Sequence, residues 1–294
     1  MPYEDRRVKP PFEQPAGCGG VPHFRAGMLL LALMAGPANA AAADPDDAET
    51  SVCGSLREPL AFWLFRSAAG AADARRIAGI RDIERLALKT RDGRSLGGYR
   101  LRHPDPRGYL LVVPGNAMLA DQIAAELQFF RDRGLDVYVY DYRGYGLSSG
   151  KSRLAAIVGD YREIVAHLNG LGYRRRLLYG MSMGGVVLLD AVGDRPEQYD
   201  ALVVDASPSR ISPLGCPQAY DPVDHLPARC TRIKIIGGER DRVVTLAEMQ
   251  ELLAAAQACG AHITRSAEFA HPFQDASAAV QRRRFQEVVD FLAP

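Results

Sequence analysis

The amino-acid sequence predicts an α/β fold: a doubly wound, mostly parallel eight-stranded sheet flanked by helices. Two observations lead to this fold class. From residue 84 onward, short apolar runs alternate with longer stretches in which apolar residues recur at spacings of three and four. Three of these stretches end at a glycine (Gly134, Gly170 and Gly260), where a left-handed residue commonly terminates a helix. The chain has 294 residues, 47% of them hydrophobic, which is enough for one sizeable core.

The first forty residues differ in composition from the rest. A basic lead rich in proline and glycine precedes the apolar run "AGMLLLALM". At about ten residues, this run is too short to span the ~30 Å hydrocarbon core of a bilayer. The small residues Ala38 and Ala40 complete a cleavage pattern. We therefore predict a signal peptide over residues 1–40, cleavage after Ala40, and export to the periplasm or the exterior. An uncleaved membrane anchor is the alternative, because the lead is long and contains acidic residues.

Four cysteines follow the predicted cleavage site: Cys53, Cys216, Cys230 and Cys259. Disulfides persist in exported proteins. We expect Cys216 to pair with Cys230, because this bridge closes a proline-rich loop of about fifteen residues and contributes ~3 kcal/mol in the chain-entropy model. Cys53 then pairs with Cys259. Four free thiols are the alternative.

The expected elements follow in chain order. Residues 41–83 form a helical extension in which "LAFWLF" packs against the outside of the domain at residues 84–294. Eight apolar runs are predicted strands: 85–90, 96–101, 109–114, 136–142, 176–181, 201–206, 232–237 and 262–267. Five stretches are predicted amphipathic helices: 119–134, 154–170, 184–193, 246–260 and 279–292. Residues 207–231 contain five prolines and no clear period, which predicts a loop or short cap over the carboxyl edge of the sheet.

The charge balance excludes some partners. Thirty-six Lys and Arg against 35 Asp and Glu give a net charge of +1, so no general attraction to nucleic acid or anionic lipid is expected. The basic runs 174–176 and 282–284 contain no interleaved aromatic residues, which favours solvated edges of a strand and a helix. No histidine pair has the spacing of metal ligands, and we expect neither a metal nor a cofactor.

The stretch "GMSMG" at residues 180–184 lies where a predicted strand ends and a helix begins. Strand and helix pass so closely at such a turn that Gly180 and Gly184 are needed beside the serine. The turn presents the hydroxyl of Ser182 and places the amide of Met183 at a helix N-terminus, where negative charge is stabilised. Ser182 is therefore a candidate nucleophile.

A serine nucleophile needs a base and a carboxylate that orients the base. Asp241 follows one predicted strand in "IIGGERDRVV", and His271 follows the last in "EFAHPF". The other histidines are poorly placed in the predicted elements. Asp205 also ends a strand at this edge and is the alternative acid, with helix or turn capping as its structural role. Asp141 and Arg143 are expected to brace their own loop.

With its elbow "GMSMGG", the loop "VVPGNA" (112–117) and the stretch "DYRGYGLSSG" (141–150), the chain resembles the α/β-hydrolase superfamily of serine hydrolases over about residues 84–294. The resemblance implies a Ser182, Asp241 and His271 triad, with backbone amides of Met183 and Asn116 as oxyanion donors and Ala117 as the alternative to Asn116. Pro114 stands where that family usually has a histidine whose side chain braces the loop.

The resulting hypothesis is a serine hydrolase that cleaves carboxylic esters or thioesters of small molecules through an acyl-enzyme, without nucleic acid, stable membrane span or protein partner. A catalytically silent scaffold and a serine peptidase or amidase are the alternatives. A phosphate-binding reading of "GYGLSSGKS" fails because its glycines have the wrong spacing. Substrate-binding residues stay unknown: four side chains fit either a pocket or the core, namely Met118, Tyr145, Met183 and Phe273.

Overall fold

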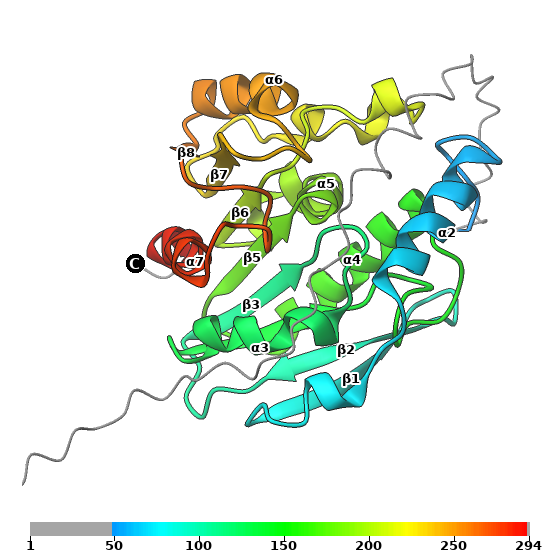
Figure 1. The fold of residues 1–294 in the computed structure, drawn as a ribbon, viewed down its shortest axis with the longest axis vertical. Helices are drawn as coiled ribbons and strands as arrows, with labels where there is room; N and C mark the ends of the chain where they lie inside the picture. The colour runs from blue at the N-terminus through cyan, green and yellow to red at the C-terminus, as the bar shows by residue number, and fades with distance from the viewer. Residues whose placement is uncertain (1–48, 293–294) are drawn as a thin grey trace, which may run out of the picture.

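One sheet forms the centre of the computed structural model, which describes residues 49–292 (Figure 1). Its eight strands lie in the order β1-β2-β4-β3-β5-β6-β7-β8. They are β1 (Ile83–Lys89), β2 (Ser95–Leu101), β3 (Gly108–Val113), β4 (Leu135–Tyr140), β5 (Arg176–Met181), β6 (Ala201–Asp205), β7 (Ile233–Gly238) and β8 (His262–Ser266). β2 pairs antiparallel with β1 and β4, and the other pairings are parallel. The predicted eight-stranded, mostly parallel sheet is confirmed.

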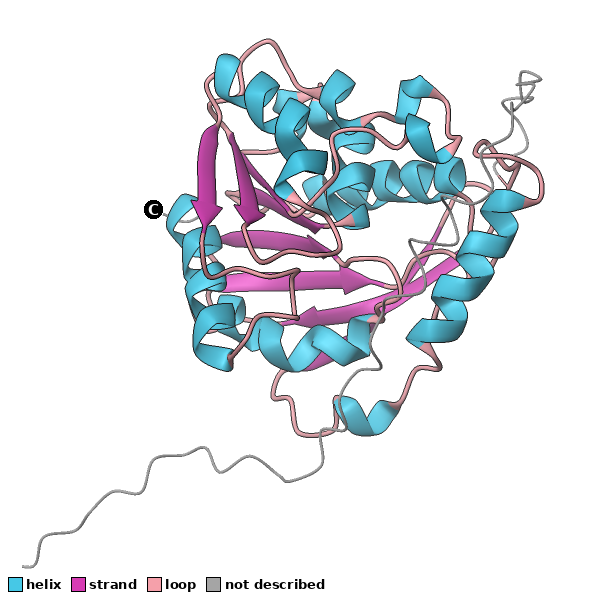
Figure 2. Cartoon of the chain, turned by 45° about the horizontal axis from the view of Figure 1, so that its top comes forward, coloured by secondary structure: helices cyan, strands magenta, loops and turns pink. Residues whose placement is uncertain are grey.

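Helices cover both faces of this sheet (Figure 2). The α-helices are α2 (Arg57–Ala69), α3 (Ala120–Arg131), α4 (Leu154–Asn169), α5 (Met183–Leu188), α6 (Leu246–Ala258) and α7 (Ala278–Leu292). A π-helical turn, η2 (Leu189–Gly193), continues α5. Short 3-10 turns are η1 (Ala74–Arg76), η3 (Pro196–Gln198), η4 (Ser212–Leu214), η5 (Gln218–Tyr220) and η6 (Pro222–His225). One apolar core lies under α3 and α7, and a second under α2, α4, α5 and α6.

The position of each strand explains its composition. β3, with the sequence GYLLVV, is buried at every residue, as is β6 with the sequence ALVVD. Such strands are apolar on both sides because helices cover both faces of the sheet. β1 lies at the edge, and half-buried residues alternate there with exposed ones such as Arg85 and Lys89. Because the neighbouring strands from β4 to β8 run parallel, their carboxyl ends lie at the same edge of the sheet.

Helix α2 lies beyond the carboxyl ends of the parallel strands (Figure 1). Its buried Glu58 accepts hydrogen bonds from the amides of Leu154 (2.6 Å) and Cys53 (2.7 Å). At the other end of α2, the carbonyl of Ala69 accepts a bond from the side-chain amide of Gln122 (2.8 Å). These contacts fix α2 against the first turns of α3 and α4.

The predicted disulfide pairing is wrong. Cys53 pairs with Cys216, with 4.0 Å between their Cα atoms, and Cys230 pairs with Cys259, with 5.1 Å between theirs. Sequence proximity favoured a bridge from Cys216 to Cys230, but α2 brings the start of the described chain to the segment after β6. Cys230 lies just before β7 and Cys259 just after α6, where the amide of Cys230 donates to the carbonyl of Cys259 at 2.8 Å.

Two of the three helix-terminating glycines behave as predicted. Gly134 and Gly260 have φ angles of 87° and 91°. Gly170 does not, because it keeps a helical φ of −75° and its amide still bonds back to the carbonyl of Ala166 at 3.2 Å. Gly172, with φ 79°, takes the left-handed conformation instead.

The predicted signal peptide lies outside the described residues. Between residues 49 and 292, no helix combines the length and apolar character needed to cross a bilayer.

Candidate active site

Ser182 occupies the turn between β5 and α5 with a left-handed φ of 53° and a ψ of −120°. A Cβ atom on Gly180 would lie 2.5 Å from the carbonyl oxygen of Gly184, and one on Gly184 would lie 2.1 Å from that of Val113. Both distances are shorter than any stable contact, so only glycine fits at these positions. The predicted need for glycine on each side of Ser182 is confirmed, and Ser182 itself is half-buried.

Hydrogen bonds to β6 and the loop after it hold this unfavourable turn in place. The amide of Ser182 donates to the carbonyl of Asp205 at 2.8 Å. The carbonyl of Ser182 accepts bonds from the hydroxyl of Ser207 (2.7 Å) and the amide of Gly185 (2.9 Å). A strained backbone persists when its surroundings determine it in this way. Ser207 has no signal in the sequence beyond its place two residues after a strand.

The structure brings Asp241 and His271 into contact. Oδ2 of Asp241 lies 2.8 Å from Nδ1 of His271, and both residues are buried. Oδ1 of Asp241 accepts the amides of Val243 (2.8 Å) and Val244 (2.9 Å). A carboxylate at Nδ1 favours the tautomer with a proton on that nitrogen, which leaves Nε2 able to accept one. Across residues 49–292, no hydrogen bond joins the hydroxyl of Ser182 to this imidazole.

The loop after β3 passes close to the serine. A Cβ atom on Gly115 would lie 3.5 Å from the Cβ of Ser182. The amide of Ala117 is occupied, because it donates to Oδ1 of Asn116 at 3.0 Å. The amide of Met183, at the first position of α5, has no carbonyl partner inside that helix. The loop after β3 and the first residue of α5 therefore both lie beside Ser182.

Two tyrosines brace the loop in which Pro114 replaces the expected histidine. The hydroxyl of Tyr142 donates to the carbonyl of Pro114 at 2.5 Å, and that of Tyr145 donates to Oδ1 of Asn116 at 2.9 Å. Burial raises the pKa of Tyr145, so its phenol stays protonated and remains a donor. Sequence reasoning assigned Tyr145 only to the pocket or the core and missed Tyr142, because neither lies near Pro114 in the sequence.

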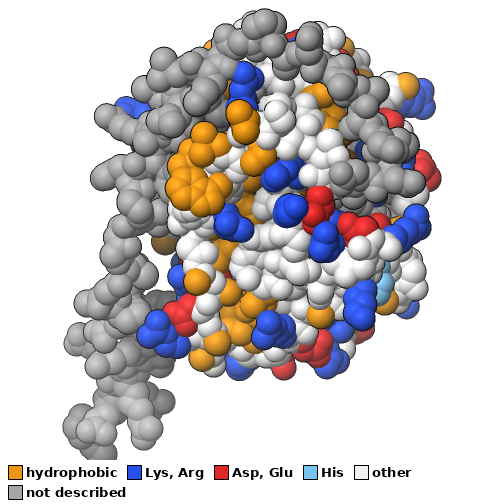
Figure 3. Space-filling model, turned by 90° about the vertical axis from the view of Figure 1, so that its right-hand side faces the viewer, with side chains coloured by type: hydrophobic (Ala, Val, Ile, Leu, Met, Phe, Trp, Pro, Cys, Tyr) orange, Lys and Arg blue, Asp and Glu red, His pale blue; other side chains and the backbone are white. Residues whose placement is uncertain are grey.

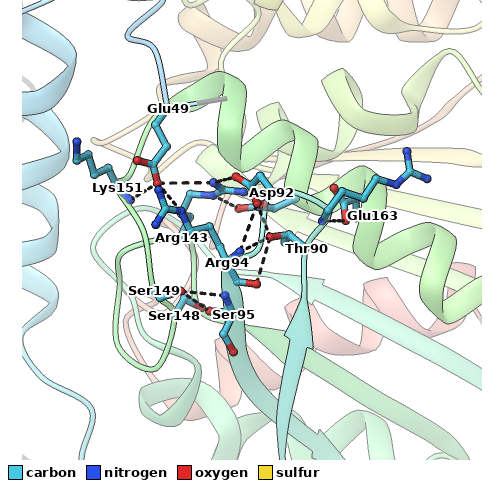
Figure 4. Close-up of polar contacts among 12 residues, drawn as sticks. Glu49, Thr90, Asp92, Arg94, Ser95, Arg143, Ser148, Ser149, Lys151 and Glu163 are labelled. Atoms are coloured by element: carbon cyan, nitrogen blue, oxygen red, sulfur yellow. Dashed lines mark hydrogen bonds and ion pairs between the residues drawn. The ribbon is translucent and has the colours of Figure 1, made fainter. Parts of the chain in front are cut away.

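A polar network holds the loop that carries both tyrosines (Figure 4). Asp141 accepts the amides of Ala120 (2.7 Å) and Leu147 (2.9 Å). Nε of Arg143 donates to Asp160 at 2.9 Å, and Nη1 contacts Asp92. These contacts agree with the predicted bracing role of Asp141 and Arg143.

The same network draws in distant parts of the chain. Glu49 contacts Arg143 at 3.7 Å and Arg94 at 3.0 Å, so it ties the start of the described chain to the turn between β1 and β2. Burial opposes ionisation of Asp92, yet hydrogen bonds from Arg143 and Thr90 hold its pKa at about 2.

Asp205, the alternative acid, is engaged elsewhere. Its Oδ1 lies 2.6 Å from Nη1 of Arg284, and its Oδ2 accepts the hydroxyl of Tyr179 at 2.9 Å. The partner of His271 is therefore Asp241. The expectation that residues 282–284 form a solvated helix edge is wrong for Arg284, which is completely buried because α7 turns this side chain towards the end of β6.

The remaining candidate residues divide between core and site. Tyr145 is fully buried and belongs to the core. Three others are half-buried: Met118, which follows the loop 112–117; Met183, next to Ser182; and Phe273, two residues after His271. His225 lies in η6, where Nε2 contacts Asp190 (3.0 Å). Within the described part of the chain, no cluster of three or more His, Cys, Asp or Glu side chains is arranged to hold a metal ion.

The outer face of α2 is apolar near this edge. Leu56, Leu60 and Trp63 recur at helical spacing and are 84%, 41% and 53% exposed. Figure 3 shows the side of the molecule that carries α2, where hydrophobic side chains gather among Lys and Arg. The disulfide between Cys53, just before α2, and Cys216 links α2 covalently to the segment that contains η4, η5 and η6.

Parts of this sequence are similar to known proteins. A family model described as serine aminopeptidase, S33, matches residues 104–228. A monoacylglycerol lipase of Mycolicibacterium smegmatis is 34% identical over 105 residues, which are 34% of this chain and 38% of that protein. The mitochondrial palmitoyl-protein thioesterase ABHD10 of Homo sapiens is 29% identical over 122 residues, which are 42% of this chain and 37% of that protein. The chain thus spans well under half the length of either relative.

The likeness in three dimensions is broader. The esterase Pf2001 of Pyrococcus furiosus superposes with a TM-score of 0.58 at 16% identity, over 71% of this chain and 91% of that chain. At that identity, the likeness establishes a shared fold. The strand order, the glycine-flanked serine turn and the family match agree with it. The chain therefore has the α/β-hydrolase fold, and over residues 104–228 it is similar to hydrolases with that fold.

Proposed function

We propose that this protein is an exported serine hydrolase that cleaves carboxylic ester or thioester bonds through an acyl-enzyme. The observation that carries the proposal is the contact of 2.8 Å between Asp241 and His271, in a fold that also holds Ser182 in a strained, half-buried turn. His271 takes the proton of the serine hydroxyl, Asp241 orients the imidazole, and the deprotonated oxygen attacks the carbonyl carbon.

The oxyanion of the tetrahedral intermediate is stabilised by the amides of Met183 and Asn116. The proton held by His271 passes to the leaving alcohol or thiol, and the acyl group stays on Ser182. Water, deprotonated by His271, then attacks the acyl carbon and releases the acid. The bracing of Asn116 by Tyr145 supports this assignment, since a fixed amide needs no rearrangement when charge develops.

Relatives support esters or thioesters as the substrate class, because a lipase and a thioesterase are among the matched proteins. The description of the family model favours a second candidate, a serine peptidase or amidase, which uses the same nucleophile on a peptide carbonyl. The two disulfides support export to an oxidising compartment.

The test is labelling with a fluorophosphonate, which phosphonylates activated serines, followed by intact mass and peptide mapping. Wild type is expected to take up one adduct on Ser182, and Ser182→Ala none. Ser67→Ala, which alters an exposed serine of α2, is the matched control and is expected to label like wild type. Ser182→Ala should also lower kcat by about 10³-fold or more without a change in the melting temperature. An unlabelled, folded wild type would end the proposal in favour of a silent scaffold.

Parallel assays with p-nitrophenyl esters, acyl thioesters and aminoacyl nitroanilides separate the candidate substrate classes. Turnover of the first two, lost in Ser182→Ala, supports the proposal. Turnover of the nitroanilides alone would establish the peptidase instead.

A further inference from the structure

Helix α7 contributes the largest completely buried side chain, that of Arg284. Its guanidinium donates in three directions: to Asp205 (2.6 Å), to Asp275 (2.8 and 3.0 Å) and to the carbonyl of Ala270 (2.5 Å). The ring of Phe269 lies 4.4 Å from the guanidinium carbon. A buried charge is costly, and it is retained when each of its donors is matched.

These partners connect the two halves of the candidate site. Asp205 ends β6, and its carbonyl receives the amide of Ser182 at 2.8 Å. Ala270 directly precedes His271, and Asp275 follows it by four residues and also accepts the amide of Ala270 at 2.8 Å. One side chain therefore links the strand end that holds the serine turn to both ends of the histidine loop.

Other contacts hold the same loop, which we define as residues 269–275. One turn before Arg284, Oε1 of Gln281 accepts the amide of Phe273 at 3.0 Å. Phe273 has a left-handed φ of 64°, which a bulky residue adopts only under constraint. On the opposite side, the carbonyl of Phe269 accepts the amide of Arg240 at 3.0 Å, next to the turn that carries Asp241. The loop is thus held between α7 and the end of β7.

We propose that Arg284 is a positioning residue for His271: by binding Asp205, Ala270 and Asp275 together, it sets the place of the imidazole between Asp241 and Ser182. The inference rests on the proposed serine hydrolase function. Arg284 itself does not touch the reacting atoms. Its guanidinium is shared by two carboxylates, those of Asp205 and Asp275.

The first test compares Arg284→Lys with wild type. Lysine keeps the positive charge, but its ammonium cannot form the planar set of bonds that reaches three partners. Arg283→Lys is the matched control, because the neighbouring Arg283 is an exposed side chain paired with Glu268 on the surface. The readouts are the rate constant of fluorophosphonate labelling, its final stoichiometry, and kcat and KM for an ester substrate.

We expect Arg284→Lys to label at least about tenfold more slowly while reaching full stoichiometry, with kcat reduced by a similar factor and KM changed less than about twofold. If Arg284 only stabilised the fold, some Arg284→Lys molecules would be unfolded and would lower the final stoichiometry of labelling. The folded molecules would then label with the wild-type rate constant. A wild-type rate constant in Arg284→Lys would overturn the inference.

A second pair of variants decides the matter if Arg284→Lys does not fold. Asp275→Asn keeps the shape of the side chain and leaves Arg284 paired with Asp205, and we expect labelling about three- to tenfold slower. Asp205→Asn removes the charged partner of Arg284 at the end of β6, and we expect labelling to slow by a similar factor. Labelling at the wild-type rate in both variants would overturn the inference. An unlabelled wild type would instead remove the proposed function itself.

Discussion

The hydrogen bond from Tyr145 to Asn116 leads to a testable prediction about the loop 112–117, which we propose carries one oxyanion donor. In Tyr145→Phe, the only group lost is a hydroxyl that donates to Oδ1 of Asn116 at 2.9 Å, from a side chain with no exposed surface. The Asn116 side chain keeps its bond from the amide of Ala117. We expect the backbone of Asn116 to become more mobile, because its side-chain oxygen loses one of the two hydrogen bonds that it accepts.

The magnitude follows from that single bond. A buried neutral hydrogen bond contributes about 1 kcal/mol to the free energy of unfolding, which lowers the melting temperature of a domain of this size by about 2–4 °C. If the same 1 kcal/mol is lost from stabilisation of the oxyanion, kcat falls about fivefold. Complete loss of one oxyanion donor costs about 10²–10³-fold, which sets the upper limit. KM should stay unchanged, since the bond acts on charge that develops only in the transition state.

The sequence offers a closely matched control in Tyr109. Its hydroxyl donates to Oδ1 of Asn169 at 2.7 Å, it is equally buried, and it lies at the opposite end of the strand that leads to the oxyanion loop. Tyr109→Phe should lose similar stability and keep full kcat. Steady-state ester hydrolysis and thermal melts of the two variants measure both quantities. Equal kcat in Tyr145→Phe and Tyr109→Phe, at equal loss of stability, would refute the role assigned to the brace.

Two further predictions concern stability. Replacing Cys230 and Cys259 together by alanine opens a loop with a sequence separation of 29, and loop-closure entropy predicts a loss of about 3.5 kcal/mol in a urea titration; a loss below about 1 kcal/mol would contradict this account. Hydrogen bonding to Asp190 raises the pKa of His225, so its contribution is fully present below about pH 6.5 and is lost as pH rises through the raised value. Between about pH 6 and 9, the melting temperature of wild type should therefore fall more than that of His225→Gln, and parallel curves would contradict the prediction.

Local patterns predicted the parts of this protein that depend on neighbours in the sequence. Strand runs and helical spacing located the sheet, because burial on both faces demands continuous apolar residues in the central strands. The glycines at positions 180 and 184 predicted the turn at Ser182, since its close backbone approach excludes side chains. The order of Asp241 and His271 after successive strands also predicted a pair at one edge, and the structure places these two in contact.

Features that depend on residues distant in the sequence could not be predicted from local patterns. The basic run at the end of the sequence looks the same whether its members face solvent or, as with Arg284, a buried carboxylate 79 residues away. Nothing near Pro114 in the sequence indicates what braces its loop, because Tyr142 and Tyr145, which donate to Pro114 and Asn116, come from the loop after β4. Disulfide pairing failed for a related reason, since nothing local to Cys53 indicates that α2 carries it to Cys216.

The observed disulfides have a consequence for biogenesis. From Cys53 onward, each bridge joins two consecutive cysteines of the sequence, Cys53 with Cys216 and Cys230 with Cys259. In a chain cleaved after Ala40 and oxidised as it emerges from a translocation channel, Cys53 meets no competitor before Cys216 appears. Cys230 and Cys259 are then left for each other. Pairing in the order of emergence gives the observed bridges, so we predict that maturation of an exported chain requires a thiol oxidant and no isomerase.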